Sequence, residues 1–151
     1  MDQRVLDASY TISTDPARFD IDAIHAYLSN DSYWCAGIPR ETLERAVRNS
    51  IGAGAFLGGA QVGFARAATD RATFAWVCDV YVLEGHRGKG LAQAMVRALL
   101  AHPELQGLRR WVLATRDAHE VYRRVGFEPL PNAQSWMAIV DREVYSRRAG
   151  A

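Results

Sequence analysis

The chain has 151 residues, of which 49% are hydrophobic, so it holds enough apolar material for one core, and we expect a single domain over residues 1–151. Its 18 lysine and arginine residues nearly balance 17 aspartate and glutamate residues, and the net charge of +1 argues against binding to nucleic acid or to an anionic membrane. The two cysteines, Cys35 and Cys78, show neither metal-ligand spacing nor a disulfide framework, so we expect no metal. No apolar run approaches the roughly 20 residues of a membrane span, and no apolar leader follows Met1. We therefore expect a cytoplasmic protein.

The N-terminal third predicts one strand and two helices. Residues 10–14 fit a short strand, and apolar residues recur at helical spacing over residues 22–28. A second helix is expected after Pro39, which suits a first helical turn, and its apolar stripe extends to Ile51. Gly52 and Gly54, just beyond this stripe, are expected to end the helix.

The middle of the chain predicts strands. Two apolar runs, residues 55–57 and 61–68, flank the pair Gly58-Gly59, which is typical of a tight hairpin turn. A longer apolar run over residues 72–83 predicts a further strand, in which Asp79 is a polar exception. These strands supply the centre of the predicted sheet.

The C-terminal half returns to helices. A helix is expected from Leu91 to about residue 102, and a strand over residues 110–114 follows it. A strand, a helix and a second strand in this order form a βαβ crossover, which requires the two strands to run parallel or nearly so. A short helix is expected after Asp117 as N-cap, and residues 135–140 are expected to add the closing strand of the sheet. The fold class is therefore mixed α/β.

A glycine-rich turn joins the predicted strand at 72–83 to the helix at Leu91. Its sequence is Arg87-Gly88-Lys89-Gly90. The first turn of a helix leaves backbone N–H groups unpaired, and the helix dipole adds partial positive charge there. Glycines let the main chain approach a phosphate closely, and the two basic side chains offer charge-assisted hydrogen bonds. The turn lacks the spacing of a Walker loop or a dinucleotide fingerprint, so it predicts either a pyrophosphate seat or merely a tight turn.

Two motifs then resemble one family. Arg87-x-x-Gly90-x-Ala92 is similar to the Arg/Gln-x-x-Gly-x-Gly/Ala signature of the GNAT superfamily of acetyl-CoA-dependent N-acetyltransferases. Downstream, the segment from Val121 to Pro129, with Tyr122 and Gly126-Phe127, resembles the Leu-Tyr-x-x-x-Gly-Phe segment of the same family. The resemblance covers residues 73–129 specifically and the remainder by the order of its elements.

The resemblance implies a fold and a cosubstrate. The fold would be a largely antiparallel central sheet with a parallel βαβ crossover at the cofactor site, flanked by about four helices. Acetyl-CoA would bind with its pyrophosphate at the amides of the turn, which comprises Arg87, Gly88, Lys89, Gly90, Leu91 and Ala92, and its pantetheine arm would bond the main chain of Val80, Tyr81 and Val82. Family members often carry a CoA-contacting asparagine seven residues before the motif tyrosine, and this chain has Thr115 there.

Acetyl transfer to an amine needs a proton donor for the departing thiolate and a base for the amine. The family places its motif tyrosine near the sulfur, so Tyr122 is the candidate donor; an ordinary buried tyrosine is the alternative. Asp79, a carboxylate in an apolar strand, is the candidate base, or else a structural partner for an arginine. His119 is a second candidate for the base, and Cys78 is a weaker candidate nucleophile whose strand position fits the core.

The segment between the first two helices carries Tyr33 and Trp34, which are expected either to enclose an acceptor or to cover the sheet as core aromatics. The acceptor is expected to be an amine of a small molecule or peptide, and the protein a monomer or homodimer. Two other functions fit the turn: a non-catalytic acyl-CoA-binding module or sensor, which would dispense with Tyr122 and Asp79, and a nucleotide-phosphate binder.

Overall fold

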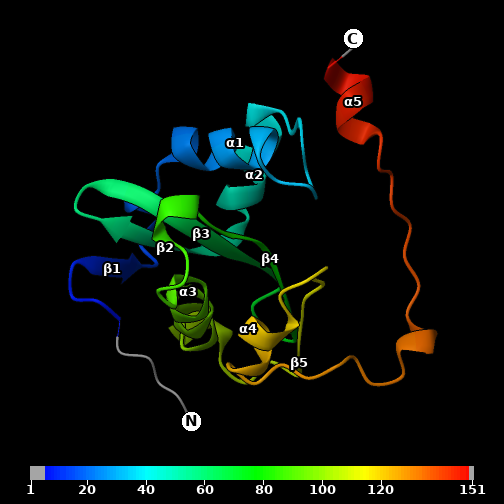
Figure 1. Ribbon diagram of the computed structural model, residues 1–151. Helices are drawn as coiled ribbons and strands as arrows, with labels where there is room; N and C mark the ends of the chain where they lie inside the picture. Colours follow the sequence, from blue (N-terminus) through cyan, green and yellow to red (C-terminus); the bar gives the residue numbers. More distant parts are fainter. Residues whose placement is uncertain (1–5, 150–151) are drawn as a thin grey trace.

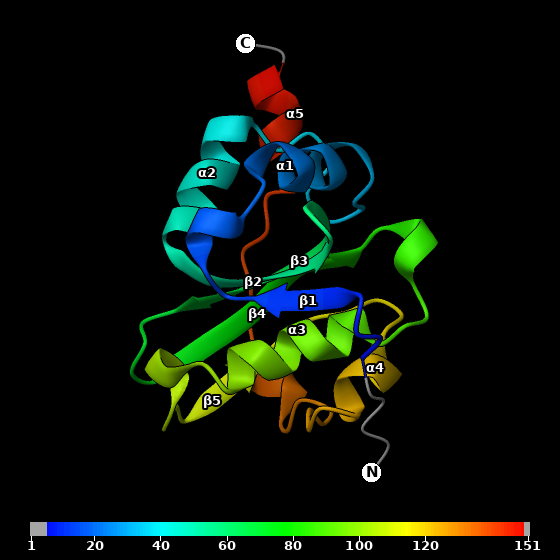
Figure 2. The same cartoon turned by 90° about the vertical axis from the view of Figure 1, so that its left-hand side faces the viewer.

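A five-stranded mixed sheet lies between two layers of helices in the computed structural model, which describes residues 6–149 (Figures 1 and 2). The strands are β1 (Tyr10–Ser13), β2 (Ser50–Leu57), β3 (Ala60–Thr69), β4 (Phe74–Val82) and β5 (Arg110–Val112). The helices are α1 (Ile21–Asn30), α2 (Arg40–Arg48), α3 (Leu91–Leu100), α4 (His119–Arg123) and α5 (Val144–Ala149). Short 3₁₀ turns lie at Pro16–Arg18, Glu84–His86, Pro103–Leu105 and Ala133–Ser135.

The sheet has the strand order β1-β2-β3-β4-β5. The first three neighbouring pairs are antiparallel, whereas β4 and β5 run parallel and are joined through α3. A parallel pair needs such a crossover, because the chain must return to the end from which it started. The predicted mixed α/β class, with a largely antiparallel sheet and one βαβ crossover, is confirmed.

Each face of the sheet is covered by its own helices. Helix α3 lies below the sheet in Figure 2, and its Leu91, Met95 and Leu99 are buried in the cluster on that face. Helices α1 and α2 lie above it and bury Ile24 and Leu28, with Leu43, around Phe64 of β3. The apolar stripes that predicted these helices are therefore the surfaces that hold the layers together. No helix within residues 6–149 has the length and apolar composition needed to cross a bilayer.

The prediction that the second helix extends to Ile51 and ends at Gly52 is wrong. Helix α2 ends at Arg48, and Ile51 lies inside β2, where it is paired with Ala67 of β3. Gly52 is a strand residue for a packing reason: a Cβ there would lie 2.8 Å from the Phe19 ring and 3.0 Å from that of Phe64. The glycine therefore marks a close approach of aromatic rings instead of a helix terminus.

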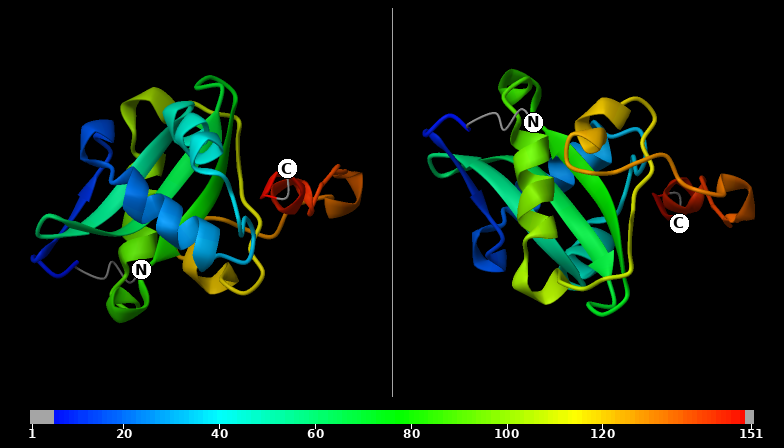
Figure 3. Two further views of the ribbon diagram at one scale, coloured as in Figure 1. Left: turned by 90° about the horizontal axis from the view of Figure 1, so that it is seen from above. Right: turned by 90° about the horizontal axis from the view of Figure 1, so that it is seen from below.

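Two further expectations in the C-terminal part are corrected. Asp117 does not cap α4, because Ala118 occupies the N-cap position and its backbone N–H donates to the Thr115 hydroxyl at 3.1 Å. Residues 135–140 do not close the sheet, because Ser135 ends a 3₁₀ turn and no strand follows it. In Figures 1 and 3 this segment runs outside the body of the protein, beside the edge of the sheet that β5 forms.

Candidate active site

The parallel strands β4 and β5 separate after three residue pairs. Phe74, Ala75 and Trp76 face Arg110, Trp111 and Val112, and no later residue of β4 pairs with β5. An opening of about 400 Å³ lies where the strands part, and its lining includes Tyr33, Trp34, Asp79, Val80, Thr115 and Tyr122. Because β5 separates from β4 after Trp76, one edge of β4 has no neighbouring strand at its carboxyl end. Backbone N–H and C=O groups on this edge can bond a ligand.

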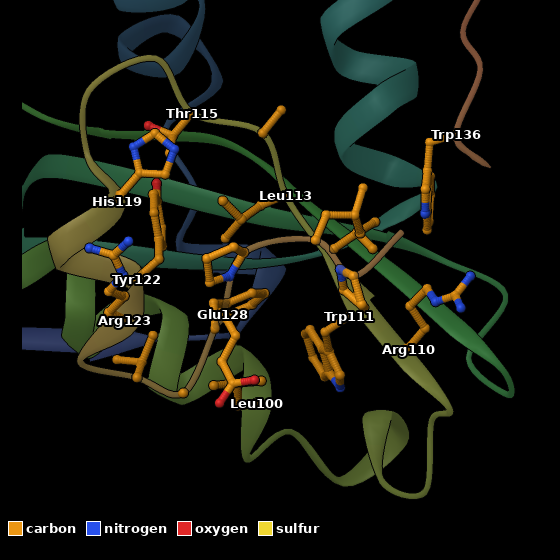
Figure 4. Close-up of a pocket in the computed structure, with 18 of the residues that line it drawn as sticks. Leu100, Arg110, Trp111, Leu113, Thr115, His119, Tyr122, Arg123, Glu128 and Trp136 are labelled. Atoms are coloured by element: carbon orange, nitrogen blue, oxygen red, sulfur yellow. The ribbon is translucent and has the colours of Figure 1, made fainter. Parts of the chain in front are cut away.

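A larger groove of about 680 Å³ continues from this opening along β5 to α4 (Figure 4). Its lining includes Trp111, His119 and Trp136. Thr115 and Tyr122 line both spaces, so they stand where the two meet. This continuity places the predicted proton donor at the junction of two adjoining cavities.

Strand β4 is irregular at Asp79, and the irregularity turns the carboxylate toward the loop after α1. Asp79 has a φ of 54°, and the pairing of β3 with β4 shifts between Phe64 and Arg66. Ala75 and Val80 both belong to the cluster on the α3 face, although five residues apart they would point to opposite faces of a regular strand. An extra residue in β4 therefore forms a bulge, a device often found beside active sites.

Asp79 is buried and engaged on both carboxylate oxygens. Arg66 Nε donates to its Oδ2 at 2.6 Å, and Trp34 Nε1 donates to its Oδ1 at 2.9 Å. Arg66 also donates through Nη1 to the Ser50 hydroxyl at 3.0 Å. Burial is the largest single effect on the Arg66 guanidinium and lowers its pKa, but the attraction and hydrogen bond of Asp79, together with the nearby Cys78 and Cys35, outweigh burial and raise that pKa. The arginine partner considered for Asp79 is present in the fold.

Tyr122 lies on α4 with its ring edge against Phe127, the centroids being 6.2 Å apart. Burial, with a smaller contribution from Tyr33, raises the pKa of the Tyr122 phenol to about 12. Figure 4 shows its hydroxyl pointing toward the side of the groove occupied by His119 and Thr115. A phenol with this pKa stays protonated throughout the physiological range and can act as a hydrogen-bond or proton donor.

Tyr33 and Trp34 form a wall of the opening and do not belong to the core. Their side chains are 53% and 40% exposed, and their rings meet edge to face at 5.0 Å. The Arg116 guanidinium lies 3.9 Å from the centroid of the Tyr33 ring, and Trp34 is held by Asp79. The first of the two interpretations of these aromatics, that of a cleft wall, matches their position.

The glycine-rich turn has the backbone that an anion site needs. Gly88 and Gly90 have φ values of 79° and 80°, in the region that favours glycine. Gly90 is the N-cap of α3, no side chain caps this helix, and its first turn has no acidic residue. A Cβ added at Gly88 would meet nothing within 4 Å, so the space in front of the turn is open. These features fit a pyrophosphate.

The basic residues of the turn are placed differently from each other. Arg87 donates through Nε to the Val82 carbonyl at 2.9 Å and through Nη2 to the Tyr27 hydroxyl at 3.2 Å, so it braces the turn against β4 and α1. Lys89 is exposed and near enough to Asp7 to help lower the pKa of that carboxyl, after the larger effect of hydrogen bonds from Ser9. Arg87 therefore orders the turn, while Lys89 offers charge to the solvent side.

The remaining candidate residues are Tyr81, His119 and the two cysteines. Tyr81 is buried and its ring stacks on Tyr27 with centroids 4.1 Å apart, so its side chain is not available to a ligand. His119 is exposed at the start of α4. Burial is the largest effect on both thiols and raises the pKa of Cys35 to about 11 and that of Cys78 to about 12, which makes either a poor nucleophile. Within residues 6–149, no group of three or more metal-ligating side chains is placed to hold a metal ion.

The structure brings most of the predicted residues into one region but not all into one cavity. Asp79, Val80, Thr115 and Tyr122 meet at the opening between the strands, with Tyr33 and Trp34. The turn from Arg87 to Ala92 lines neither cavity, and it lies at the far end of the exposed edge of β4. Arg66 and Arg116 carry no signal in the sequence, because neither stands in a motif and both contact partners distant in the chain.

Comparisons with known proteins bear on the family and the fold of this chain. Residues 13–127 match the model of the Acetyltransferase (GNAT) family. A protein of Gibberella zeae, named as a candidate acetyltransferase, is 37% identical in an alignment 135 residues long that covers 75% of this chain and 75% of that protein. A crystal structure from Xanthomonas campestris pv. campestris, described as a candidate acetyltransferase of the GNAT family, has a TM-score of 0.86 and 47% identity over 91% of this chain and 96% of that one.

A more distant structure shares the fold. A GNAT family acetyltransferase of Elizabethkingia anophelis, solved with acetyl-CoA bound, has a TM-score of 0.62 and 13% identity, and it covers 83% of this chain and 80% of its own. The fold is thus shared with acetyltransferases of the GNAT family. The chain belongs to the GNAT family, as its two motifs indicated.

Proposed function

We propose that this protein transfers the acetyl group of acetyl-CoA to an amine of a small molecule or peptide, by direct attack within a ternary complex. The observation that carries the proposal is Tyr122, whose phenol, with a pKa raised to about 12, stands at the junction of the two cavities beside the exposed edge of β4. Acetyl-CoA would supply the acetyl group as a thioester.

The chain offers three kinds of contact to that cosubstrate. The first turn of α3 and the open space before Gly88 suit the pyrophosphate, with Lys89 as a nearby charge. The main-chain edge of β4 from Val80 to Val82, which β5 leaves unpaired, suits the amides of the pantetheine arm, although the Val82 carbonyl already accepts from Arg87 Nε. Thr115 stands near the thioester end, although its hydroxyl already accepts from Ala118. Tyr122 would then donate a proton to the departing thiolate.

The role of Asp79 follows from its contacts. With one oxygen bonded to Arg66 and the other to Trp34, it is better suited to hold Trp34 in the wall of the opening than to remove a proton directly. The proton of the amine would pass to His119, which lines the groove with Tyr122, or to water. The raised pKa values of the buried thiols support direct transfer over an acyl-enzyme.

The test mixes the protein with acetyl-CoA and a panel of amines and follows the appearance of free CoA thiol. We expect thiol release that depends on the amine, and a fall of about 100-fold or more in kcat for Tyr122→Phe with unchanged acetyl-CoA affinity. Tyr145→Phe is the matched control, since it makes the same chemical change on α5. Acetyl-CoA binding without turnover on any amine would support the non-catalytic module instead. Full turnover by Tyr122→Phe would remove the tyrosine from the mechanism.

A further inference from the structure

The C-terminal arm, residues 129–143, leaves a long apolar segment in solvent. Every described residue from 128 to 143 is exposed, and the sequence from Trp136 to Val140 is Trp-Met-Ala-Ile-Val. Met137, Ile139 and Val140 are 96%, 104% and 68% exposed. Five consecutive apolar residues, among which Trp136, Ile139 and Val140 have high strand propensity, are an aggregation hazard unless something covers them.

The same chain carries an uncovered strand edge. Strand β5 ends the sheet, so the backbone groups on its outer side have no neighbouring strand within residues 6–149. The groove of about 680 Å³ runs along this edge, and Trp111, Leu113 and Leu130 give it apolar walls. An unpaired edge next to an apolar groove is a surface to which an extended segment can add as a strand.

The first residues of the arm and Trp136 line this groove from their own chain, but residues 137–140 do not line it. Trp136 sits at the groove, with the Arg110 guanidinium 5.0 Å from its ring centroid, and Tyr145 packs on the α1–α2 cluster near Gly37. Between these two contacts, residues 137–140 point into solvent. Pro129 and Pro131 fix their own φ angles and keep the residues before them extended, so the root of the arm resists turning back along β5. Figure 3 shows the arm passing outside the body.

We propose that two copies of this chain exchange their arms, so that residues 137–140 of each copy pair with the β5 edge of the other. Each chain carries both the apolar arm segment and the unpaired β5 edge. Two copies related by a two-fold axis can therefore form both arm–β5 contacts at once. Each sheet gains a sixth strand, and the apolar segment is buried. The partner's arm also forms the outer wall of the groove that Thr115, His119 and Tyr122 line, so the catalytic cavity is complete only in the dimer.

Sedimentation equilibrium of the full chain tests the association. We expect twice the mass of one chain at micromolar concentration, and for Ile139→Asp a dissociation constant raised about 100-fold or more, because the charge would be buried in the exchanged strand. Leu57→Asp is the matched control: Leu57 is also an exposed large apolar residue, but it lies at the β2–β3 hairpin, and its change should leave the mass unaltered. Because Ile139 is fully exposed in one chain, both variants should keep the circular dichroism of the parent. A monomeric parent would overturn the proposal.

A second measurement identifies the partner surface. A photo-reactive p-benzoylphenylalanine at position 137 is placed in chains of ordinary and ¹⁵N-labelled protein, which are mixed, irradiated and digested. We expect cross-links from position 137 to residues 110–115 that join peptides of different isotope. Cross-links confined to one isotope would show that the arm folds onto its own chain, and cross-links to another surface would place the dimer contact elsewhere; either overturns the exchange. Neither measurement depends on acetyl transfer, so a failed activity assay leaves this result unaffected.

Discussion

Replacing Asp79 by asparagine tests the buried ion pair at the bulge of β4. The carboxylate and the Arg66 guanidinium are 2.6 Å apart, and their side chains are only 6% and 18% exposed. Asparagine keeps the shape of the side chain and tolerates the positive φ of 54° at this position, so the substitution adds little backbone strain. It removes the negative charge and replaces one acceptor oxygen by a donor.

The expected cost can be worked from these contacts. An amide can accept from either Arg66 or Trp34 but not from both through separate oxygens, so one donor loses its acceptor. Leaving a buried charge without its partner costs about 3–5 kcal/mol, and Arg66 retains the Ser50 hydroxyl and some solvent, which favours the lower end, about 3 kcal/mol. For a domain of this length, that free energy corresponds to a fall in Tm of about 6–12 °C.

Urea denaturation of the parent, Asp79→Asn, Arg66→Met and the double variant measures the coupling. We expect a coupling free energy of about 2 kcal/mol or more. Asp22→Asn is the matched control, because Asp22 pairs with Arg40 on the surface, with side chains 78% and 50% exposed, and should lose less than about 1 kcal/mol. If Asp79→Asn costs no more than this control, the pair is not a structural element. The pH–rate profile of the folded variant separates the two roles of Asp79: loss of the acidic limb would show a base, and an unchanged limb a positioning residue.

Three further outcomes follow from the same structure. The first concerns the pH–rate profile. Because an acid acts in its protonated form and the pKa of Tyr122 is about 12, this group should give the profile no alkaline limb below about pH 10. An alkaline limb below that pH that disappears in Tyr122→Phe would contradict the assignment. Gly88→Val should weaken acetyl-CoA binding about tenfold or more in calorimetry, because it forces a branched side chain to a φ of 79° and into the space before α3. Gly85→Ala is the control: Gly85 is also open but has no positive φ, so this variant should bind acetyl-CoA as the parent does. Cys35 and Cys78 should react with N-ethylmaleimide at pH 8 at least about 100-fold more slowly in the native protein than in guanidinium, since pKa values of about 11 and 12 leave little thiolate. Rapid labelling of the native protein would mean that a thiol can be the nucleophile.

Most elements of the fold could be predicted because their signals are local. Apolar spacing identified α1 and α3, the Gly58-Gly59 pair identified the β2–β3 hairpin, and the order of strand, helix and strand required the parallel pair. The exceptions have tertiary causes. Gly52 looks like a helix terminator until the rings of Phe19 and Phe64 are seen to occupy the space of its missing side chain.

The sequence by itself determined where two parts of the proposed site lie: a glycine turn at a helix N-terminus and a tyrosine on the next helix are fixed by neighbours a few residues away. Only the tertiary structure decided what surrounds them. The bulge at Asp79 and its contacts with Arg66 and Trp34 join three separate segments, and the direction of the C-terminal arm depends on which edge is left unpaired. Such features arise from packing between distant residues, which no local spacing encodes.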